Sequence, residues 1–368
     1  MASPQPSITI PHFMRAWTLT HRGLPRDILQ LSSHYPVPQV DSETAVLIRI
    51  SHVALHPGTI IMMTLAPSLL RRFPSIAETD FSGTVVAVGA QVPVSATSHP
   101  GRYFSPGTAV FGSVPVSKHL QGCGALAEYV VVDVTQIARK PVNMSFAAAA
   151  GLPVSGATAL ALLDALPAPP DARARVLVNG ACGGIGHFVT QLLATRENPA
   201  TIMGTCSESS AEVARTCGCH EVLDYRNLTG REKLAFDAII DAFGSQALWR
   251  DAARWLKPGQ GHVYVSVGPA LEAYTVAGAV AALVRQVLNR FMPVWMGGVD
   301  REYKQVLSVV DAGKLERLRQ LAEEGRLETW IGGTWAFENA MQAFEILLGR
   351  HAKGKLVVRV QDLAPGED

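Results

Sequence analysis

Glycines crowd one short stretch of the chain, residues 176–186, which reads VLVNGACGGIG. The stretch follows a predicted strand and opens a predicted helix, a context in which a glycine pattern indicates dinucleotide binding. Gly180 permits a tight turn, the next two glycines let backbone N–H groups approach a pyrophosphate, and Gly186 lets the helix pack closely on the strand. The helix N-terminus adds partial positive charge. We predict cofactor contacts at Gly180, Cys182, Gly183, Gly184, Ile185 and Gly186. The alternative is a glycine-rich turn without a ligand.

The end of the next predicted strand, residues 201–206, bears on which dinucleotide fits. An acidic residue there would hold the ribose 2′-hydroxyl of NADH, whereas this chain has Cys206 followed by Ser207. The lack of a carboxylate tolerates a 2′-phosphate, although Glu208 argues the other way. Side chains that could bind a phosphate are Ser207, Ser210, Tyr225 and Arg226. We predict NADPH as the cofactor, with NADH as the less favoured alternative.

The composition limits the class of protein around this motif. The chain has 368 residues, which indicates two or three domains. Hydrophobic residues make up 48% and charged residues 17%, enough to build real cores. A net charge of +1 argues against nucleic acid as a partner. Five irregularly spaced cysteines argue against a disulfide framework, so we expect an intracellular, cytoplasmic enzyme.

The longest apolar stretch, residues 274–296, raises the question of a membrane. It is interrupted by Arg285, Gln286, Asn289 and Arg290. A spanning helix would bury both arginines at a cost of several kcal/mol, roughly on any insertion scale. The N-terminus lacks the basic cluster and apolar core of a signal peptide. We therefore expect a soluble chain without a transmembrane segment, and a peripheral membrane contact stays open.

The order of predicted elements indicates an α/β fold in two parts. The first third is β-rich, with strands expected over residues 45–52, 83–88, 109–112 and 127–132, and it predicts a small barrel or twisted sheet. Residues 145–166 read as helical, divided at Pro153 and Gly156. Strands and helices then alternate: strands over 175–179, 201–206, 221–224, 236–241 and 262–267, helices over 184–195, 209–217 and 246–256. This alternation predicts a parallel sheet covered on both faces. Two more helices and a strand over 355–360 close the chain.

Five segments in family order resemble the zinc-independent quinone oxidoreductase and enoyl reductase branch of the medium-chain dehydrogenase/reductase superfamily. They are residues 80–89 (DFSGTVVAVG), 124–129 (GALAEY), 148–160 (AAAGLPVSGATAL), the turn at 180–186, and 351–360 (HAKGKLVVRV). The resemblance implies a GroES-like catalytic domain, residues 1–152 and 303–368, and a Rossmann NAD(P)-binding domain, residues 153–302, with the active site between them. It also implies that Thr158 lies near the nicotinamide, that Phe243, Val267 and Gly268 line the cofactor groove, and that a homodimer could form.

The zinc ligands of related alcohol dehydrogenases are missing from this sequence. Residues 55–59, LHPGT, contain no cysteine, and residues 79–81, TDF, stand where a His-Glu pair would be sought. Cys217 and Cys219 are closely spaced, but no second pair completes a tetrahedral site. We therefore expect no zinc and no other metal.

The sequence departs from the family pattern in the loop that would supply a proton donor. The family's Asn-x-x-Asp-x-Tyr is here His56, Thr59 and Ile61. The Pro-Gly that usually precedes x-Asp-Phe is Ala77-Glu78, and a further family Asp is Thr108. Imidazole titrates near working pH, so His56 could donate a proton or bind a carbonyl. The plainer interpretation is a loop histidine that replaces a structural asparagine.

Together these features predict a metal-free NADPH-dependent reductase of an activated C=C bond, in an enone or quinone that is bulky and hydrophobic. Hydride transfer to the β-carbon would leave an enolate that needs a hydrogen-bond donor and a proton. Phe291, Trp295 and Met296 could line a substrate pocket, form a dimer face, or belong to an ordinary helix core. Two rivals remain: a redox-neutral isomerase or cyclase on the same fold, and a cofactor-binding sensor without turnover.

Overall fold

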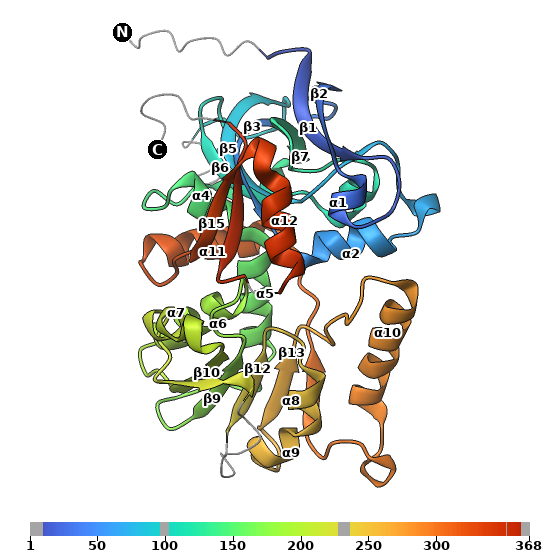
Figure 1. The fold of residues 1–368 in the computed structure, drawn as a ribbon. Coiled ribbons are helices and arrows are strands. Elements are labelled where there is room, and N and C mark those ends of the chain that lie inside the picture. Colours follow the sequence, from blue (N-terminus) through green and yellow to red (C-terminus); the bar gives the residue numbers. More distant parts are fainter. Residues whose placement is uncertain (1–9, 96–102, 227–235, 351, 362–368) are drawn as a thin grey trace.

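The structure is a computed structural model, and it describes the chain except for residues 1–9, 96–102, 227–235, 351 and 362–368. Two β-sheet regions lie one above the other, and helix α5 (Pro153–Asp164) runs between them (Figure 1). One region is built mainly of antiparallel strands and the other of parallel strands. The structure thus confirms the predicted α/β class, with a GroES-like part and a Rossmann-like part.

The parallel sheet has the strand order of a doubly wound nucleotide-binding fold. Its strands are, in spatial order, β11 (Glu221–Asp224), β10 (Thr201–Cys206), β9 (Arg175–Asn179), β12 (Ala238–Asp241), β13 (Val263–Ser266) and β14 (Glu302–Gln305). The strand order reverses between β9 and β12, the place where ligands bind beyond the carboxyl ends of such sheets. The apolar runs of β12 and β13 are buried throughout, as expected for strands covered on both faces.

Strand β14 lies across the domain boundary predicted at residue 303. It pairs in parallel with β13, so the sheet continues to Gln305. We propose that the cofactor-binding unit extends through this strand. The sequence prediction missed β14 because its residues, EYKQ, are polar and half-buried, as an edge strand allows.

Short helices cover the parallel sheet. They are α6 (Gly186–Ala194), α7 (Ala211–Thr216), α8 (Gln246–Arg250) and α9 (Ala252–Trp255), and α10 (Val276–Phe291) lies farther out (Figure 1). The helix predicted to begin at residue 184 begins at Gly186. The single helix predicted over residues 246–256 is two helices, separated at Asp251.

The helical stretch before the parallel sheet is also in two pieces, but the division is not where we predicted it. Ser145 caps α4 (Phe146–Ala150) by accepting a hydrogen bond from the backbone of Ala148, as expected. The break falls at residues 151–152, and Gly156 lies inside α5, so the prediction of a break there is wrong. A Cβ on Gly156 would lie 2.7 Å from the Leu318 side chain, so this glycine permits close packing against α11 (Ala312–Glu323).

The antiparallel region holds the strands that position the candidate site. Its seven-stranded sheet has the order β15 (Ile331–Ala336), β16 (Lys355–Arg359), β3 (Ala45–Leu55), β5 (Asp80–Val88), β6 (Ala109–Ser113) and β8 (Ile137–Arg139), and β7 (Tyr129–Asp133) pairs with β3. A second sheet has the order β2 (Gln30–Pro36), β1 (Phe13–Leu19) and β4 (Ser75–Ile76). Helices α4 and α11 pack against this region, which also carries α1 (Pro25–Ile28), α2 (Pro57–Leu65), α3 (Val116–Leu120) and α12 (Ala340–Leu348).

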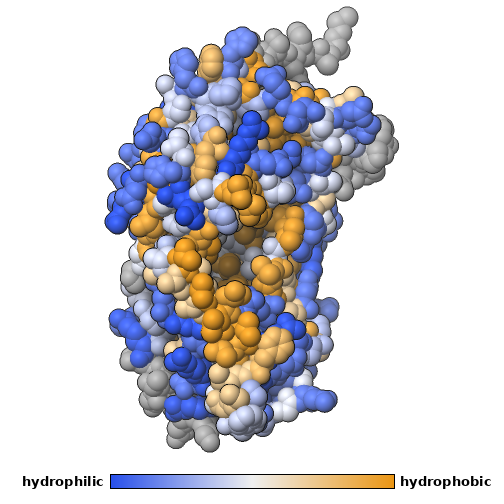
Figure 2. Space-filling model, turned by 90° about the vertical axis from the view of Figure 1, so that its right-hand side faces the viewer, coloured by the Kyte–Doolittle hydropathy of each residue, from blue (hydrophilic) through white to orange (hydrophobic). Residues whose placement is uncertain are grey.

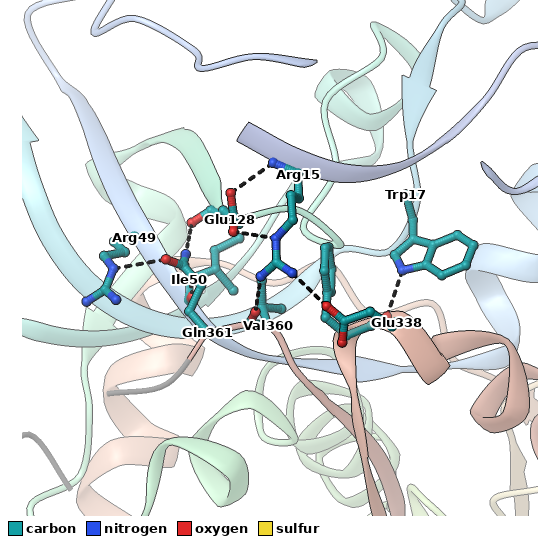
Figure 3. Close-up of polar contacts among 9 residues, drawn as sticks. Arg15, Trp17, Arg49, Ile50, Glu128, Glu338, Val360 and Gln361 are labelled. Carbon is teal, nitrogen blue, oxygen red and sulfur yellow. Dashed lines mark hydrogen bonds and ion pairs between the residues drawn. The ribbon is translucent and has the colours of Figure 1, made fainter. Parts of the chain in front are cut away.

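Polar contacts join the two ends of the chain within this region (Figure 3). Arg15 on β1 forms ion pairs with Glu128 at 2.8 Å and with Glu338 at 2.6 Å. Gln361 accepts a hydrogen bond from Arg49 at 3.0 Å and donates to the Glu128 carbonyl at 2.7 Å. Residues more than 300 positions apart are therefore held together, which fixes β16 beside β3.

Candidate active site at the junction of the two sheets

The glycine turn between β9 and α6 has the close approaches that the motif predicts. Gly180 has φ +74, a conformation that favours glycine. A Cβ on Gly186 would lie 2.0 Å from the Gly180 carbonyl oxygen, so only glycine fits where the helix meets the strand. A Cβ on Gly183 would lie 3.2 Å from the same oxygen. The backbone at the head of α6 therefore fits the diphosphate of a dinucleotide.

A polar network at the carboxyl ends of the strands holds this turn in place. Asn179 donates to the Asp241 carboxylate at 2.7 Å and accepts from the Thr205 hydroxyl at 2.5 Å. The Asp241 carboxylate also accepts backbone N–H bonds from Phe243, Gly244 and Ser245, at 2.7–3.1 Å. Sequence reasoning missed Asn179, Thr205 and Asp241 as site residues. Each is a polar residue at or near the end of an apolar strand, which is a detectable signal.

The predicted groove residues on the next two loops lie around the same strand ends. Phe243 is 48% exposed, and the following glycine has φ +89. Val267 is half-buried and its N–H donates to the Asp241 carbonyl at 3.1 Å. Gly268 has φ +100, and its N–H donates to the Ser266 hydroxyl at 3.0 Å. These backbones form one continuous edge with the glycine turn.

The predicted 2′-phosphate residues lie beyond β10 and β11. The Ser207 hydroxyl is 3.0 Å from that of Ser210, which is buried. Tyr225 is 49% exposed, and Arg226 already pairs with Asp224 at 2.7 Å. The structure adds a cation that sequence reasoning missed: the ammonium of Lys353 donates to the Ser209 carbonyl at 2.7 Å. Lys353 lies in the segment 351–360 that carries the family resemblance, but that segment does not show that its loop returns to Ser209.

Cys182 of the turn and Cys206 at the end of β10 are both buried. They lie side by side, and the hydrogen bond between the two thiols lowers the pKa of Cys182. The backbone carbonyl of Cys182 accepts a hydrogen bond from Gly354 at 2.8 Å, so the loop before β16 is docked directly on the glycine turn.

Four ionisable side chains meet where the ends of β3, β5 and β16 come together, and we call them the junction cluster: His56, Glu78, Asp80 and Lys355. The sheet register explains the meeting, because Leu55 pairs with Leu356 and Ala54 pairs with Asp80. His56 follows β3, while Asp80 and Lys355 begin β5 and β16. Glu78 and Asp80 are fully buried, Lys355 is 2% exposed, and the His56 side chain is 13% exposed.

Hydrogen bonds connect the members of the junction cluster to neighbouring hydroxyls. The Nε2 atom of His56 lies 2.8 Å from the Thr79 hydroxyl and 3.9 Å from Oε2 of Glu78. The Thr59 hydroxyl contacts Oε1 of Glu78 at 2.6 Å. Oε2 of Glu78 and Oδ1 of Asp80 are buried without a hydrogen-bond partner among the described residues.

Burial dominates the electrostatics of the junction cluster. It lowers the pKa of His56 to about 3, so the imidazole is neutral at physiological pH. It raises the pKa of Glu78 to about 8 and that of Asp80 to about 6. Burial also lowers the pKa of Lys355, while the Asp80 and Glu78 carboxylates act in the opposite direction. The cluster therefore holds a proton near neutral pH.

The first turn of α5 joins the junction cluster to the glycine turn. The Val154 N–H donates to Asp80 at 3.0 Å, and the Lys355 ammonium donates to the Ser155 hydroxyl at 3.1 Å. A Cβ on Gly184 would lie 3.6 Å from the Lys355 side chain. Thr158, one turn farther along α5, is half-buried and its hydroxyl donates to the Val154 carbonyl at 2.7 Å. The structure thus brings the two predicted catalytic residues, His56 and Thr158, to the same junction.

Hydrophobic surface surrounds a hollow on the side of the molecule that carries α10 and α2 (Figure 2). Helix α10 has no buried residue, and its exposed apolar side chains continue into Phe291, Trp295 and Met296, which are 69%, 84% and 58% exposed. Leu69 and Leu70, which follow α2, are 96% and 64% exposed. The interpretation of residues 291–296 as a helix core is therefore wrong, whereas a substrate rim and a dimer face stay open.

The donor set at the junction does not fit a zinc ion. It combines an imidazole and two carboxylates with an ammonium group, Lys355, that already supplies positive charge among them. Among the described residues, no group of three His, Cys, Asp or Glu side chains could hold a metal.

A membrane-spanning helix is likewise not found in the part of the chain that the structure describes, where no helix combines the necessary length and hydrophobicity.

Fold and candidate site together indicate an oxidoreductase, and the similarity to known proteins agrees. Two family models match: "Alcohol dehydrogenase GroES-like domain" over residues 42–142 and "Zinc-binding dehydrogenase" over residues 217–358. The medium chain reductase pydE of Acremonium sp is 31% identical, with 94% of this chain and 99% of that protein covered. The trans-enoyl reductase poxH of Penicillium oxalicum is 28% identical, with 95% and 98% covered. The solved quinone oxidoreductase from Coxiella burnetii has a TM-score of 0.73 at 24% identity, with 95% and 99% covered.

The chain belongs to the medium-chain dehydrogenase/reductase superfamily, in its quinone oxidoreductase and enoyl reductase branch. It is an NAD(P)H oxidoreductase, so its cofactor is a nicotinamide dinucleotide. The family resemblance read from the sequence is thereby confirmed.

Proposed function

We propose that this enzyme reduces an activated C=C bond of a bulky, hydrophobic enone or quinone, with NADPH as reductant and without a metal. One observation carries the proposal: the glycine turn and the junction cluster meet at Gly184, Ser155 and Lys355. A reductase of this class needs its hydride donor beside a group that can stabilise an enolate. When bound, reduced nicotinamide supplies that hydride.

NADPH is favoured over NADH by the residues beyond β10. Cys206 leaves no carboxylate to hold a ribose 2′-hydroxyl, while Ser207, Ser210 and Tyr225 offer hydroxyls. Two cations come near these residues: Arg226 follows Tyr225 in the chain, and Lys353 donates to the Ser209 carbonyl. Arg226 is engaged by Asp224, so we assign the larger share of any phosphate attraction to Lys353.

His56 is the residue that we assign to the substrate carbonyl. Its imidazole is neutral because it is buried, so it can donate one N–H bond while its other nitrogen accepts from Thr79. Nδ1 makes no hydrogen bond within the described residues and lies near Gly58, where a Cβ would be 3.2 Å away. Thr158, whose hydroxyl donates to the Val154 carbonyl, is the residue that we place next to the nicotinamide.

The exposed apolar side chains around the hollow, which we call the hydrophobic rim, support an apolar substrate; they include Leu69, Leu70, Phe291, Trp295 and Met296. Two similar proteins are named for related chemistry, one a trans-enoyl reductase and one a quinone oxidoreductase. The same apolar face could serve a homodimer. The predicted cytoplasmic location is part of this proposal and rests on the sequence alone.

The test is NADPH oxidation with a panel of enones and quinones of increasing chain length. Substrate-dependent loss of NADPH absorbance supports the proposal. Substrate conversion without that loss would instead identify a redox-neutral isomerase or cyclase, which the altered residues His56, Thr59 and Ile61 keep as the second candidate. A change in cofactor fluorescence alone, without conversion, would identify a sensor.

A further inference from the structure

Three residues that depart from the family pattern contact one another in the structure. His56, Thr59 and Glu78 belong to two segments about 20 positions apart, yet Thr59 contacts Glu78 at 2.6 Å and Glu78 lies 3.9 Å from the His56 ring. Departures that were independent would have no reason to meet. Their contact indicates that they act together, with Glu78 as the member whose role is unassigned.

Glu78 occupies a backbone position that suits glycine. Its φ is +60, and glycine adopts that conformation without the steric cost that a side chain brings. Such strain costs on the order of 1–3 kcal/mol and persists where the surrounding structure requires it. The carboxyl group is also fully buried, which is a second cost. A fully buried glutamate on a strained backbone, aimed at a histidine, indicates a function rather than a solvated surface residue.

The contacts of Thr59 fit a Glu78 that carries a proton. The Thr59 hydroxyl lies 2.8 Å from the His56 carbonyl and 2.6 Å from Oε1 of Glu78, but it has one hydrogen to donate. Both contacts are hydrogen bonds if the carboxyl group donates one of them. The nearby charges agree: Lys355 is one cation beside two carboxyl groups, Glu78 and Asp80. A proton on Glu78 balances the charge.

A neutral histidine needs a proton source behind it. If a neutral imidazole gave its N–H proton to an enolate, it would become a buried imidazolate anion, unless the other nitrogen gained a proton at the same time. Oε2 of Glu78 has no other partner and faces that other nitrogen, Nε2, whose present contact is the Thr79 hydroxyl. The approach needed is about 1 Å for a direct hydrogen bond, and the Thr79 hydroxyl offers a bridge.

We propose that Glu78 is the proton reservoir of this enzyme, a positioning residue that reloads His56 as His56 protonates the reduced substrate. The idea rests on the proposed reduction. Bound dinucleotide would supply the hydride that forms the C–H bond at the β-carbon. The enolate that this leaves takes the Nδ1 proton of His56 at the oxygen that this N–H contacts, and the enol then tautomerises to the ketone in water. The Glu78 carboxyl group turns so that its proton, held toward Thr59 at rest, reaches Nε2 of His56 directly or through the Thr79 hydroxyl. The transfer leaves a neutral imidazole in its other tautomer and a carboxylate. Thr59 then donates to that carboxylate, Lys355 balances its charge, and water reprotonates it after product leaves.

The groups that face this pair set the expected pH dependence. Glu78 is surrounded by His56, Asp80 and Lys355, and His56 also feels the charge state of His119. Because burial raises the pKa of Glu78 to about 8, the reservoir is filled below that pH and empties above it. We expect kcat to fall as pH rises through about 8.

The first experiment measures the proton directly, in the protein without cofactor. Glutamate side-chain carboxyls are labelled with ¹³C, and the Glu78 signal is assigned by its loss in Glu78→Gln. A signal that titrates near pH 8 supports the reservoir. Titration in the ordinary range of glutamate, about pH 4–5, overturns it. This readout does not depend on turnover, so it separates failure of the reservoir from failure of the proposed function, which would appear as a wild type that oxidises no NADPH with any acceptor.

The second experiment compares variants with a working acceptor. Glu78→Gln keeps the shape and the Thr59 contact but cannot donate a carboxyl proton, so we expect kcat to fall about tenfold or more, with unchanged NADPH affinity, a larger solvent deuterium effect and no break near pH 8. Glu78→Gly restores the backbone preference and should be at least as stable thermally, yet show the same kinetic loss. Glu78→Asp should recover part of the rate.

The control Glu345→Gln, on an exposed position of α12, should behave as wild type. Wild-type kcat and pH profile in both Glu78→Gln and Glu78→Gly would overturn the proposal.

Discussion

The glycine turn and the junction cluster lie against each other but are built in opposite ways. The turn is local: seven consecutive residues, 180–186, contribute backbone N–H groups, and side chains matter mostly by their absence. The junction cluster is non-local: His56, Glu78 and Lys355 come from three segments, and only the pairing of β16 with β3 and of β3 with β5 brings them together.

This difference separates what each part can tolerate. Few backbone conformations can point several N–H groups at one diphosphate, so the glycine turn has the pattern that is typical of dinucleotide-binding folds. A site of side chains can change chemistry while the strands stay in place. By the resemblance seen in the sequence, this chain departs from the family pattern at His56, Thr59 and Glu78 and keeps it at the glycine turn. Substitutions in the two regions should therefore fail in different ways.

The largest expected effect comes from filling the turn. Gly183→Val places a Cβ 3.2 Å from the Gly180 carbonyl and a branched side chain where the diphosphate would lie. Losing two charge-assisted N–H bonds costs about 3–4 kcal/mol, which is roughly a hundredfold to thousandfold weaker NADPH binding. Titration calorimetry on folded protein measures it.

Gly349→Ala is the matched control, because Gly349 ends α12 with φ −67 and its nearest neighbour to an added Cβ is 3.4 Å away. It should bind NADPH as wild type does. If Gly183→Val also binds normally while folded, the turn is not the diphosphate site and the comparison between the two regions breaks down.

The next effect belongs to the junction cluster and should leave cofactor binding intact. His56→Ala removes the donor to the substrate carbonyl, so kcat should fall about a hundredfold while the Kd for NADPH stays the same. His56 is the N-cap of α2 without a side-chain cap bond, so its loss costs the helix little. Steady-state kinetics with calorimetry provide the measurement, and His21→Ala, on an exposed position, is the control. Equal losses in kcat and in NADPH affinity would mean that the two regions are not separate.

The same contrast explains how much could be predicted from the sequence. The turn, the parallel strands other than β14 and the last helices could be predicted because hydrophobic periodicity and glycine spacing are local. The break at residues 151–152 was misplaced to Gly156, since a glycine that serves helix packing looks the same in sequence as one that ends a helix. Lys355 and Lys353 could not be assigned, because nothing near them records that β16 returns to β3 and to the turn. Glu78 did leave a signal, a glutamate where the family pattern has glycine, but its partners appear only in three dimensions.

A smaller effect should sharpen the cofactor side. Lys353→Ala removes a cation near the predicted 2′-phosphate site, and a partly exposed charged contact of this kind is worth about 1 kcal/mol, or roughly fivefold in NADPH affinity. NADH affinity should not change. Arg226→Ala should cost less, because Asp224 already holds Arg226. Binding of both cofactors is measured side by side, and equal losses for NADPH and NADH would place Lys353 on the diphosphate instead.

The smallest expected effect concerns the hydrophobic rim, which belongs to neither the glycine turn nor the junction cluster. Trp295 is 84% exposed, and contact with a long alkyl substrate that buries about 30 Å² of it would contribute about 0.7 kcal/mol. Trp295→Ser should then lower kcat/KM about threefold for long acceptors and leave short ones unchanged. Val142→Ser is the control, since Val142 is 86% exposed and lies far along the chain from α10. If chain length makes no difference but the variant changes the sedimentation coefficient, the rim belongs to a subunit interface. Substrate size would then be set inside the junction, by residues such as Ile61, rather than at its entrance.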